Sequence, residues 1–190
     1  MATKAKSSEV DVVEESAKEV VLSHAARQSA VAAITNLAEL RETLGATRSW
    51  EEIEPSFTVV RKDFFEDRPL VIGGFRFNQS KKFMMKNPDN PEVLIPAEFV
   101  SMLVAAYDPK SENLIGIEEA VNPHTGEIPY WVIVNDGSTG IRDQLTRYAS
   151  KYDDDTAKCP PLVINKGLRK SEYPYESEEG VQTATTWYLG

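Results

Sequence analysis

The segment from Tyr130 to Tyr152 changes its hydrophobic period part-way along, and this change limits the folds open to the chain. Residues 130–134 (YWVIV) are aromatic and β-branched, which is typical of a largely buried strand. Residues 135–137 (NDG) then favour a turn, and Ser138 is a suitable N-cap for a helix. The apolar residues that follow recur at helical spacing: Ile141, Leu145, Tyr148 and Tyr152. The sequence therefore predicts a strand, a tight turn and one amphipathic helix.

Other segments on both sides of this unit are composed and bounded like strands. They are 69–77, 98–107, 162–165 and 183–189, with a shorter one at 57–60. The paired glycines Gly73 and Gly74 permit sharp coiling within the first of these, and Lys166-Gly167 indicates a bulge or turn. Residues 78–96 and 108–129 are expected to form long polar connections.

The order of these elements indicates the fold class. Three strands, the helix and two further strands follow one another, which is the order of the OB-fold, a small Greek-key barrel that often binds oligonucleotides. We therefore predict a mainly β protein with α: a five-stranded OB-fold-like Greek-key barrel over 56–190, with the helix between strands three and four. The helix is expected to turn Ile141, Leu145 and Tyr148 inward as a plug for one end of the barrel.

The N-terminal quarter of the chain is expected to lie outside this domain. Residues 1–18 are polar and acidic with few large apolar groups, so we predict that they are disordered. Residues 19–48 carry an alanine-rich helical pattern, and Gly45 is a suitable residue to end it. The apolar face of this N-terminal helix is narrow, which favours docking on the main domain or on another copy. We expect a homo-oligomer, with this helix as the candidate contact.

Cysteine usage and hydropathy indicate the compartment. Cys159 is the only cysteine, which excludes a disulfide framework and fits a reducing environment. No apolar run is long enough to span a bilayer, and residues 1–20 lack the apolar core of a secretory signal. These features predict a cytoplasmic protein with no membrane partner.

Charge is distributed unevenly along the chain. The net charge of −9 argues mildly against a polyanionic partner, but binding responds to the local field. Residues 61–86 contain seven basic and three acidic residues, and residues 158–170 contain four basic and no acidic ones. Residues 108–127 contain five acidic residues and one basic residue. This distribution predicts one positive surface on an otherwise acidic molecule.

The sequence lacks the usual signs of catalysis. Its two histidines, His24 and His124, are not near a serine or cysteine in a nucleophile motif, and there is no glycine-rich phosphate loop followed by lysine. Residues 153–155 (DDD) would suit a metal-dependent nuclease only if they converged with partner ligands, and a solvated helix end is the favoured interpretation. We therefore predict a protein that is not an enzyme and uses no metal or other cofactor.

The two basic tracts contain aromatic residues, the combination that binds the phosphates and bases of single strands. The candidate contacts are Arg76, Lys81, Lys82 and Lys86 in the first tract, Lys166, Arg169, Lys170 and Tyr173 in the second, and Trp131 on the third strand. For the cations the alternative is a solvated loop or hairpin, and for the strand aromatics it is a place in the core.

These residues also resemble a group of small bacteriophage proteins. The resemblance lies in the runs LVIGGFRFNQSKKF, EFVSMLVAAYD, WVIVNDGSTGIRDQL, PLVINKGLRKSEYPYE and ATTWYLG, which together cover about 69–190. Proteins of this group are regarded as single-stranded DNA-binding proteins of OB-fold type. The resemblance implies coating of exposed strands during replication or recombination in the host cell, with no cofactor. By position, it implies contacts from the nine candidates named above except Lys86.

The resemblance is incomplete at the C-terminal end. Bacterial proteins of this kind usually end in a flexible acidic tail that recruits partners, whereas this sequence ends in TTWYLG. The acidic residues of 1–18 or of 108–127 are the candidates for such a role here. The predicted function is therefore sequence-tolerant binding of single-stranded DNA in phage DNA replication or recombination. The alternative is a protein–protein interaction or structural module of a phage assembly that binds no nucleic acid.

Overall fold

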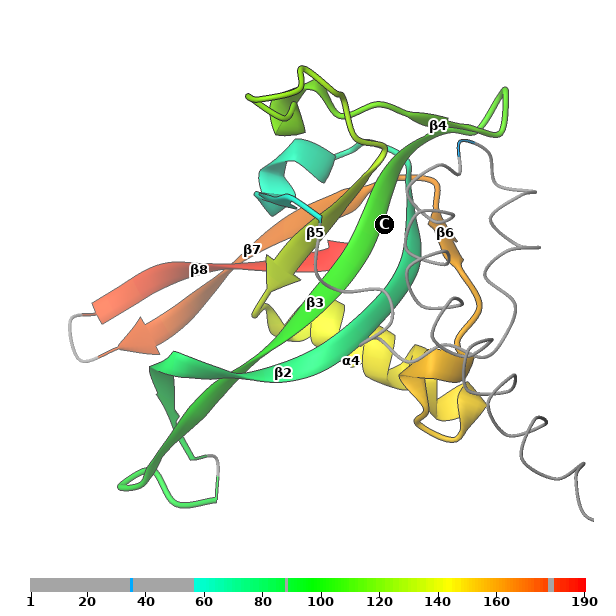
Figure 1. Cartoon of the computed structure of the whole chain (residues 1–190). Coiled ribbons are helices and arrows are strands. Elements are labelled where there is room, and N and C mark those ends of the chain that lie inside the picture. The colour runs from blue at the N-terminus through cyan, green and yellow to red at the C-terminus, as the bar shows by residue number, and fades with distance from the viewer. Residues whose placement is uncertain (1–34, 36–56, 88, 178–179) are drawn as a thin grey trace, which may run out of the picture.

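The computed structural model describes residues 35, 57–87, 89–177 and 180–190 (Figure 1). Its described part is mainly β, with a single α-helix. The strands are β1 (Val59–Val60), β2 (Leu70–Lys86), β3 (Leu94–Asp108), β4 (Asn113–Ile115), β5 (Trp131–Asp136), β6 (Leu162–Ile164), β7 (Leu168–Ser177) and β8 (Gly180–Leu189). The helix is α4 (Thr139–Ala149), and short 3-10 turns are η1 (Lys62–Phe65), η2 (Glu118–Ala120), η3 (Ser150–Tyr152) and η4 (Thr156–Lys158).

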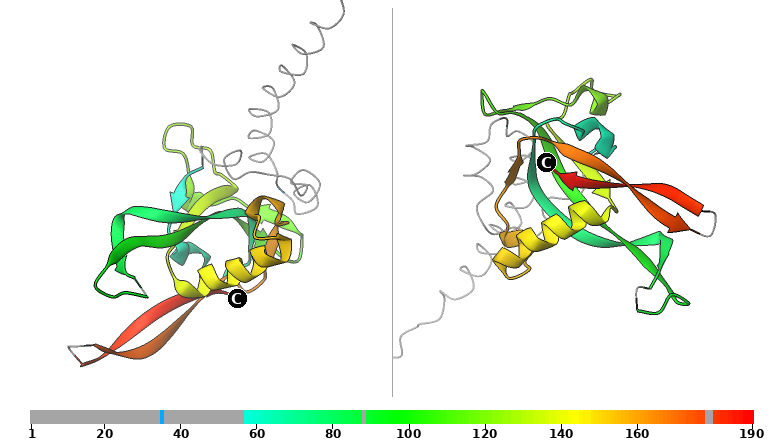
Figure 2. Two further views of the ribbon diagram at one scale, coloured as in Figure 1. Left: turned by 90° about the horizontal axis from the view of Figure 1, so that it is seen from below. Right: turned by 180° about the vertical axis from the view of Figure 1, so that it is seen from behind.

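Six strands form one sheet that curls into a half-barrel (Figures 1 and 2). Its order is β1-β5-β3-β2-β6, with β4 added to the end of β3. The long strands β2 and β3 are antiparallel, and the register shifts between Ile72 and Gly74, where the paired glycines were expected to permit coiling. The outer edge of β5 is paired in parallel by β1. Among the described residues no ladder joins β5 to β8, so the sheet is not closed by hydrogen bonds into the expected barrel.

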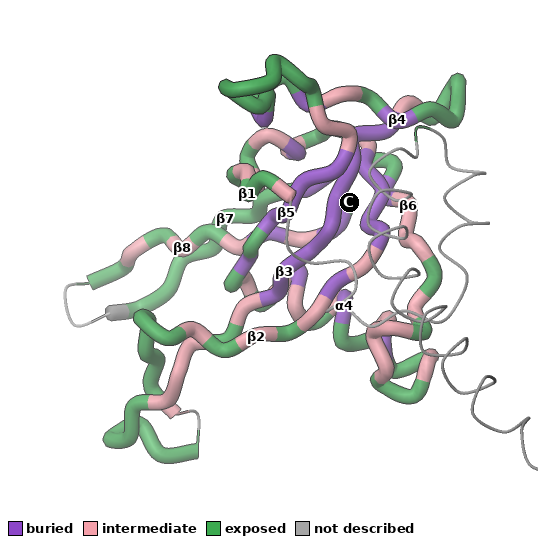
Figure 3. The backbone as a smooth tube through the Cα atoms, viewed as in Figure 1, coloured by how far each residue is buried: buried purple, intermediate pink, exposed green. Residues whose placement is uncertain are grey.

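The helix α4 covers the concave face of the sheet (Figures 1 and 3). Ile141 and Leu145 are fully buried against inward residues of β2, β3 and β5, and Tyr148 is half-buried. Ser138 occupies the N-cap position, but its hydroxyl donates to the Asp136 carboxylate instead of capping the helix. The buried Asp136 carboxylate also accepts from the Ser138 amide at 2.6 Å and pairs with Lys62. It thereby fixes the turn that leads into α4.

The strands β7 and β8 form a separate two-stranded sheet whose inner end enters the same core. Leu168, Trp187 and Leu189 are buried there, while the outer half of the hairpin is exposed (Figure 3). The sequence predicted no strand between 165 and 183, so the strand β7 was missed; Pro174 is tolerated within it because it stands at an edge position where a strand loses no ladder hydrogen bond. The turn predicted at Lys166-Gly167 is confirmed, since Gly167 has φ of +70° between β6 and β7.

Residues 78–96 are a β-hairpin instead of the polar connection predicted from the sequence. The ladder between β2 and β3 resumes at Met84 opposite Pro96 and continues to Lys86 opposite Leu94. Between Gln79 and Met84 the register shifts, so that β2 bulges away from its partner. This bulge and the hairpin beyond it project from the same side of the molecule as the β7–β8 hairpin (Figure 2).

The predictions for 1–18 and 19–48 lie outside the described residues, with one exception. Thr35 is not in a helix, and its carbonyl accepts a hydrogen bond of 2.7 Å from the Leu114 amide of β4. No helix in the described ranges is long and apolar enough to cross a membrane.

Candidate nucleic-acid interface

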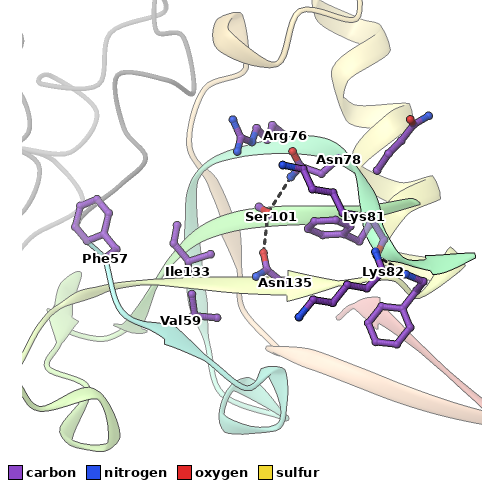
Figure 4. Close-up of a pocket in the computed structure, with 13 residues that line it drawn as sticks. Phe57, Val59, Arg76, Asn78, Lys81, Lys82, Ser101, Ile133 and Asn135 are labelled. Atoms are coloured by element: carbon purple, nitrogen blue, oxygen red, sulfur yellow. Dashed lines mark hydrogen bonds between the residues drawn. The ribbon is translucent and has the colours of Figure 1, made fainter. Parts of the chain in front are cut away.

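A pocket of about 680 Å³ opens on the outer face of the sheet, opposite the face that α4 covers. Four neighbouring elements line it, and we call it the groove (Figure 4). Its lining residues are Phe57 and Val59 at β1, Ile133 and Asn135 on β5, Phe99 and Ser101 on β3, and Arg76 with residues 78–83 on β2.

Three polar side chains form a row across the floor of the groove. Asn78 Nδ2 donates to Ser101 Oγ at 2.9 Å, and Ser101 Oγ donates to Asn135 Oδ1 at 2.7 Å (Figure 4). The three residues lie on adjacent strands and point outward. Side chains alternate along a strand, and the neighbours of Ser101 and Asn135, Met102 and Val134, are buried on the inner face. Since the row uses one amide group of each asparagine, the other donor or acceptor of each remains for a ligand.

The charged residues that line the groove in the described part of the chain are all basic. Arg76 is half-buried at the rim, and the bulge in β2 carries the exposed Lys81 and Lys82 over the open side. Neither lysine forms an ion pair within the described part of the chain. Among the described residues, no aspartate or glutamate lines the groove. Because no acidic lining residue offsets the two exposed lysines, the groove attracts anions.

Aromatic rings flank these cations. Phe83 on the bulge has 71% of its surface exposed, which leaves a ring face free for stacking. Phe57 and Phe99 are half-buried within the lining. A surface that combines cations, a polar row and exposed rings can hold both the phosphates and the bases of a single strand.

Comparison with known proteins gives no relative from which a role can be transferred. No protein-family model, curated protein or solved structure matches this chain. The function has to be argued from the groove itself.

The structure brings together only some of the nine residues predicted from the sequence. Arg76, Lys81 and Lys82 line the groove, whereas Lys86 is exposed farther out on the β2–β3 hairpin. The ring of Trp131 is 1% exposed, packed with Leu103 and other residues of the outer face, so it offers no face to a base. We therefore remove Trp131 from the predicted contacts.

The second basic tract lies apart from the groove, on β7 and the turn before it. Arg169 pairs with Asp67 at 2.9 Å, and Lys170 pairs with Glu66 at 3.0 Å. The hydrogen bond and charge of Glu66 raise the pKa of Lys170 above its ordinary value. Lys166 and Tyr173 are exposed. None of these residues lines the groove, and two of the three cations already have acidic partners.

Sequence reasoning missed the polar row and left Phe83 out of the candidate contacts. Phe83 had a usable signal, since it directly follows Lys81 and Lys82. Asn135 had a weaker one, because it is the exposed residue between buried Val134 and Asp136, whereas Asn78 and Ser101 show no such alternation.

Among the three consecutive aspartates at 153–155, Asp155 has a structural role. The Asp155 carboxylate accepts from the Ala157 amide at 3.0 Å and pairs with Lys158 at 3.4 Å. Burial, followed by the charge of Asp155, raises the pKa of the Cys159 thiol to about 11, so the thiol is protonated at neutral pH. The described residues contain no group of three or more His, Cys, Asp or Glu side chains that could hold a metal.

Proposed function

We propose that this protein binds single-stranded DNA in the groove, without base preference and without catalysis. The observation that carries the proposal is the described lining: Arg76, Lys81 and Lys82 lie around a polar row beside the exposed Phe83, and none of the described lining residues is acidic. The cations would neutralise backbone phosphates, and Phe83 would stack on a base. Stacking and phosphate contacts are available to every base, which accounts for tolerance of sequence.

The strand order supports an OB-fold-like assignment, which we propose as part of the same argument. The strands β2, β3 and β5 would be the first three, α4 the helix, β6 with β7 the fourth strand broken at Gly167, and β8 the fifth. In OB-folds, oligonucleotides bind to the face of strands two and three, beside the loops between strands one and two and between strands four and five. The groove lies over β3 and β5 and is bordered by the β2–β3 hairpin, which agrees with that arrangement.

The resemblance to bacteriophage proteins suggests the setting. We propose that the protein coats exposed single strands during phage DNA replication or recombination. This part of the proposal rests on the resemblance and on the groove together.

Binding to oligo-dT tests the function. We expect a labelled oligo-dT of roughly 30 nucleotides, long enough for at least one OB-fold site, to raise fluorescence anisotropy at low salt. If all three groove cations contact phosphates, they contribute about −2 to the slope of log affinity against log salt, because single strands release about 0.7 counterions per contact. Duplex DNA is expected to bind more weakly, since paired bases offer no stacking face. No binding at low salt would contradict the proposal.

Phe83→Ala separates stacking from charge. We expect the affinity for oligo-dT to fall roughly 5- to 150-fold, because base–aromatic stacking contributes about 1–3 kcal/mol per base. The salt slope should stay unchanged, since the substitution removes no charge. Salt-titrated anisotropy measures both quantities.

The matched control for Phe83→Ala is Met84→Ala. Met84 is the next residue on the same hairpin and is 51% exposed, but it does not line the groove. Its replacement should leave affinity nearly unchanged. An equal loss in both variants would mean that the hairpin as a whole, and not the Phe83 ring, carries the effect.

A second candidate function, an interaction module that binds no nucleic acid, is favoured by the acidic region between β3 and β5. Ile115, Val121 and Ile128 are each 40–50% exposed there, close in sequence to Glu118, Glu119 and Glu127. Exposed aliphatic groups among carboxylates are typical of a surface that binds a basic protein segment. A protein that ignores oligo-dT at low salt but forms a defined assembly in light scattering would favour this function.

A further inference from the structure

The β7–β8 hairpin has one protected edge and one open edge. In the described part of the chain the two strands form a ladder only with each other, apart from one isolated bridge between Leu168 and Glu66. A two-stranded sheet is marginally stable in water unless something else pairs with it or packs on it. Its inner end is held by the core, but from Tyr173 to Val181 the described side chains are exposed or half-exposed. The backbone groups that could pair with a further strand are the N–H and C=O groups that point away from the hairpin on each strand.

The register identifies which groups of β8 point away from β7. Gly190 N–H donates to Gly167 C=O at 2.9 Å, and the ladder runs from there with Leu168 opposite Leu189 and Pro174 opposite Thr183. Hydrogen-bonded and non-hydrogen-bonded pairs alternate in an antiparallel ladder. Thr183 and the odd-numbered residues of β8 are therefore in non-hydrogen-bonded pairs, and their N–H and C=O groups face the outer edge.

The inner part of this outer edge is already capped. Leu189 N–H donates to Gln144 Oε1 at 2.6 Å, and Gln144 Nε2 donates to Leu189 C=O at 3.0 Å. The Ser138 hydroxyl contacts Trp187 C=O at 3.3 Å. The helix α4 and its N-cap thus occupy the edge at Leu189 and Trp187, in agreement with the outward direction that the register gives.

The outer part of the edge is open. Val181, Thr183 and Thr185 are exposed or half-exposed, and their outward backbone groups have no partner in the described part of the chain. The strand β8 has no charged residue over its ten positions, and four of them are β-branched. The opposite edge on β7 is protected, because Pro174 lacks the outward N–H and charged residues flank it.

We propose that the outer edge of β8 pairs with the same edge of a second copy of this chain. The two copies of β8 would run antiparallel about a two-fold axis at Thr183, with Val181 opposite Thr185 of the second copy. The three hydrogen-bonded pairs would add about six main-chain hydrogen bonds and join the two hairpins into a four-stranded sheet.

The absence of charge from β8 is what favours a second copy as the occupant. A two-fold interface brings each residue next to its own counterpart, so a charged strand would repel itself. An uncharged strand rich in threonine and valine meets itself without that penalty, and Thr–Thr cross-strand pairs are favourable. The groove lies on other strands, so this proposal stands whether or not the protein binds DNA.

Thr183→Pro in the full-length chain tests the edge. We expect sedimentation velocity to show wild-type protein at twice the 21.2 kDa chain mass. The proline removes the central outward N–H without breaking a hydrogen bond to β7, and we expect the dimer dissociation constant to rise roughly 10- to 100-fold. Glu172→Pro is the matched control, because Glu172 has the equivalent outward position on β7, opposite Thr185. A monomeric wild type, or a dimer that Thr183→Pro leaves intact, would overturn the proposal.

A charge-swap experiment tests the two-fold register and leaves the backbone unchanged. Thr183→Lys and Thr183→Glu each place like charges opposite one another at the axis, so each variant alone should be monomeric. An equimolar mixture should recover the dimer mass, since lysine then faces glutamate. A mixture that stays monomeric would overturn the pairing about Thr183. In either case, we expect the wild type and both variants to bind oligo-dT equally well.

Discussion

Replacing Arg76, Lys81 and Lys82 together by alanine is expected to weaken binding to oligo-dT roughly 100-fold at about 0.1 M salt. Each phosphate contact to a single strand releases about 0.7 counterions, so three contacts contribute about two decades of affinity at that salt concentration. The slope of log affinity against log salt should become less negative by about 2. Anisotropy titrations of labelled oligo-dT at several salt concentrations give both numbers. The substitutions lie on the outer face and remove no residue of the buried core.

The control for this variant changes charge equally but at the other basic tract. Alanine at Lys166, Arg169 and Lys170 also removes three positive charges, so a general effect of net charge would be the same in both proteins. Because Arg169 and Lys170 are already paired with Asp67 and Glu66, we expect less than about a tenfold loss of affinity. If the two variants lose the same slope, the groove is not the site where the strand binds.

The parts of the fold that could be predicted from the sequence are those with at least one buried face. Ile141 and Leu145 recur at helical spacing because α4 buries one side, and the run from Trp131 to Val134 is apolar because both faces of β5 are covered. The hairpin at 78–96 and the strand β7 have no such pattern, since most of their side chains are exposed on both faces. Their pairing is decided by register with a partner strand, which no local period encodes.

The site residues also differ in how far the sequence could predict them. Arg76, Lys81 and Lys82 could be predicted because they cluster within seven residues of one strand. The polar row could not, since Ser101 lies 23 residues from Asn78 and 34 from Asn135, and only the sheet aligns them. The role of Trp131 depends on what packs over the outer face, which its own strand does not specify.

The second basic tract was misleading for a similar reason. In the sequence, no acidic residue lies between Asp155 and Glu172, the stretch that contains Arg169 and Lys170. In the fold, however, η1 and the turn after it bring Glu66 and Asp67 beside them. A cation cluster in a sequence therefore indicates a binding surface only when the fold places no acidic residue beside it. That condition holds for Lys81 and Lys82 within the described ranges, since none of the groove-lining residues there is acidic.

The largest effect on stability is expected from Gly167→Ala. Gly167 links β6 to β7 and has φ of +70°, a conformation that costs an alanine about 1–2 kcal/mol. A Cβ at this position would lie 2.4 Å from both Arg68 N and Arg68 O, and 2.7 Å from Phe65 O. These are backbone atoms of the segment between η1 and β2, and they cannot turn aside as a flexible side chain can. Gly167 C=O also accepts from Gly190 N–H, so a shift would disturb the end of β8.

The strain and the overpacking together should lower the free energy of unfolding by about 2–5 kcal/mol, a large fraction of the roughly 5–15 kcal/mol of a typical domain. Gly126→Ala is the matched control, because Gly126 also has φ of +70° but no other atom lies within 4 Å of the place that an alanine Cβ would take. It should cost only about 1–2 kcal/mol, the strain of the left-handed conformation. Urea denaturation of both variants separates the two contributions, since the difference between them isolates the close approach of Arg68 and Phe65. Equal losses would mean that the segment before β2 moves away from Gly167 at little cost, and that this contact does not fix β7 against the half-barrel.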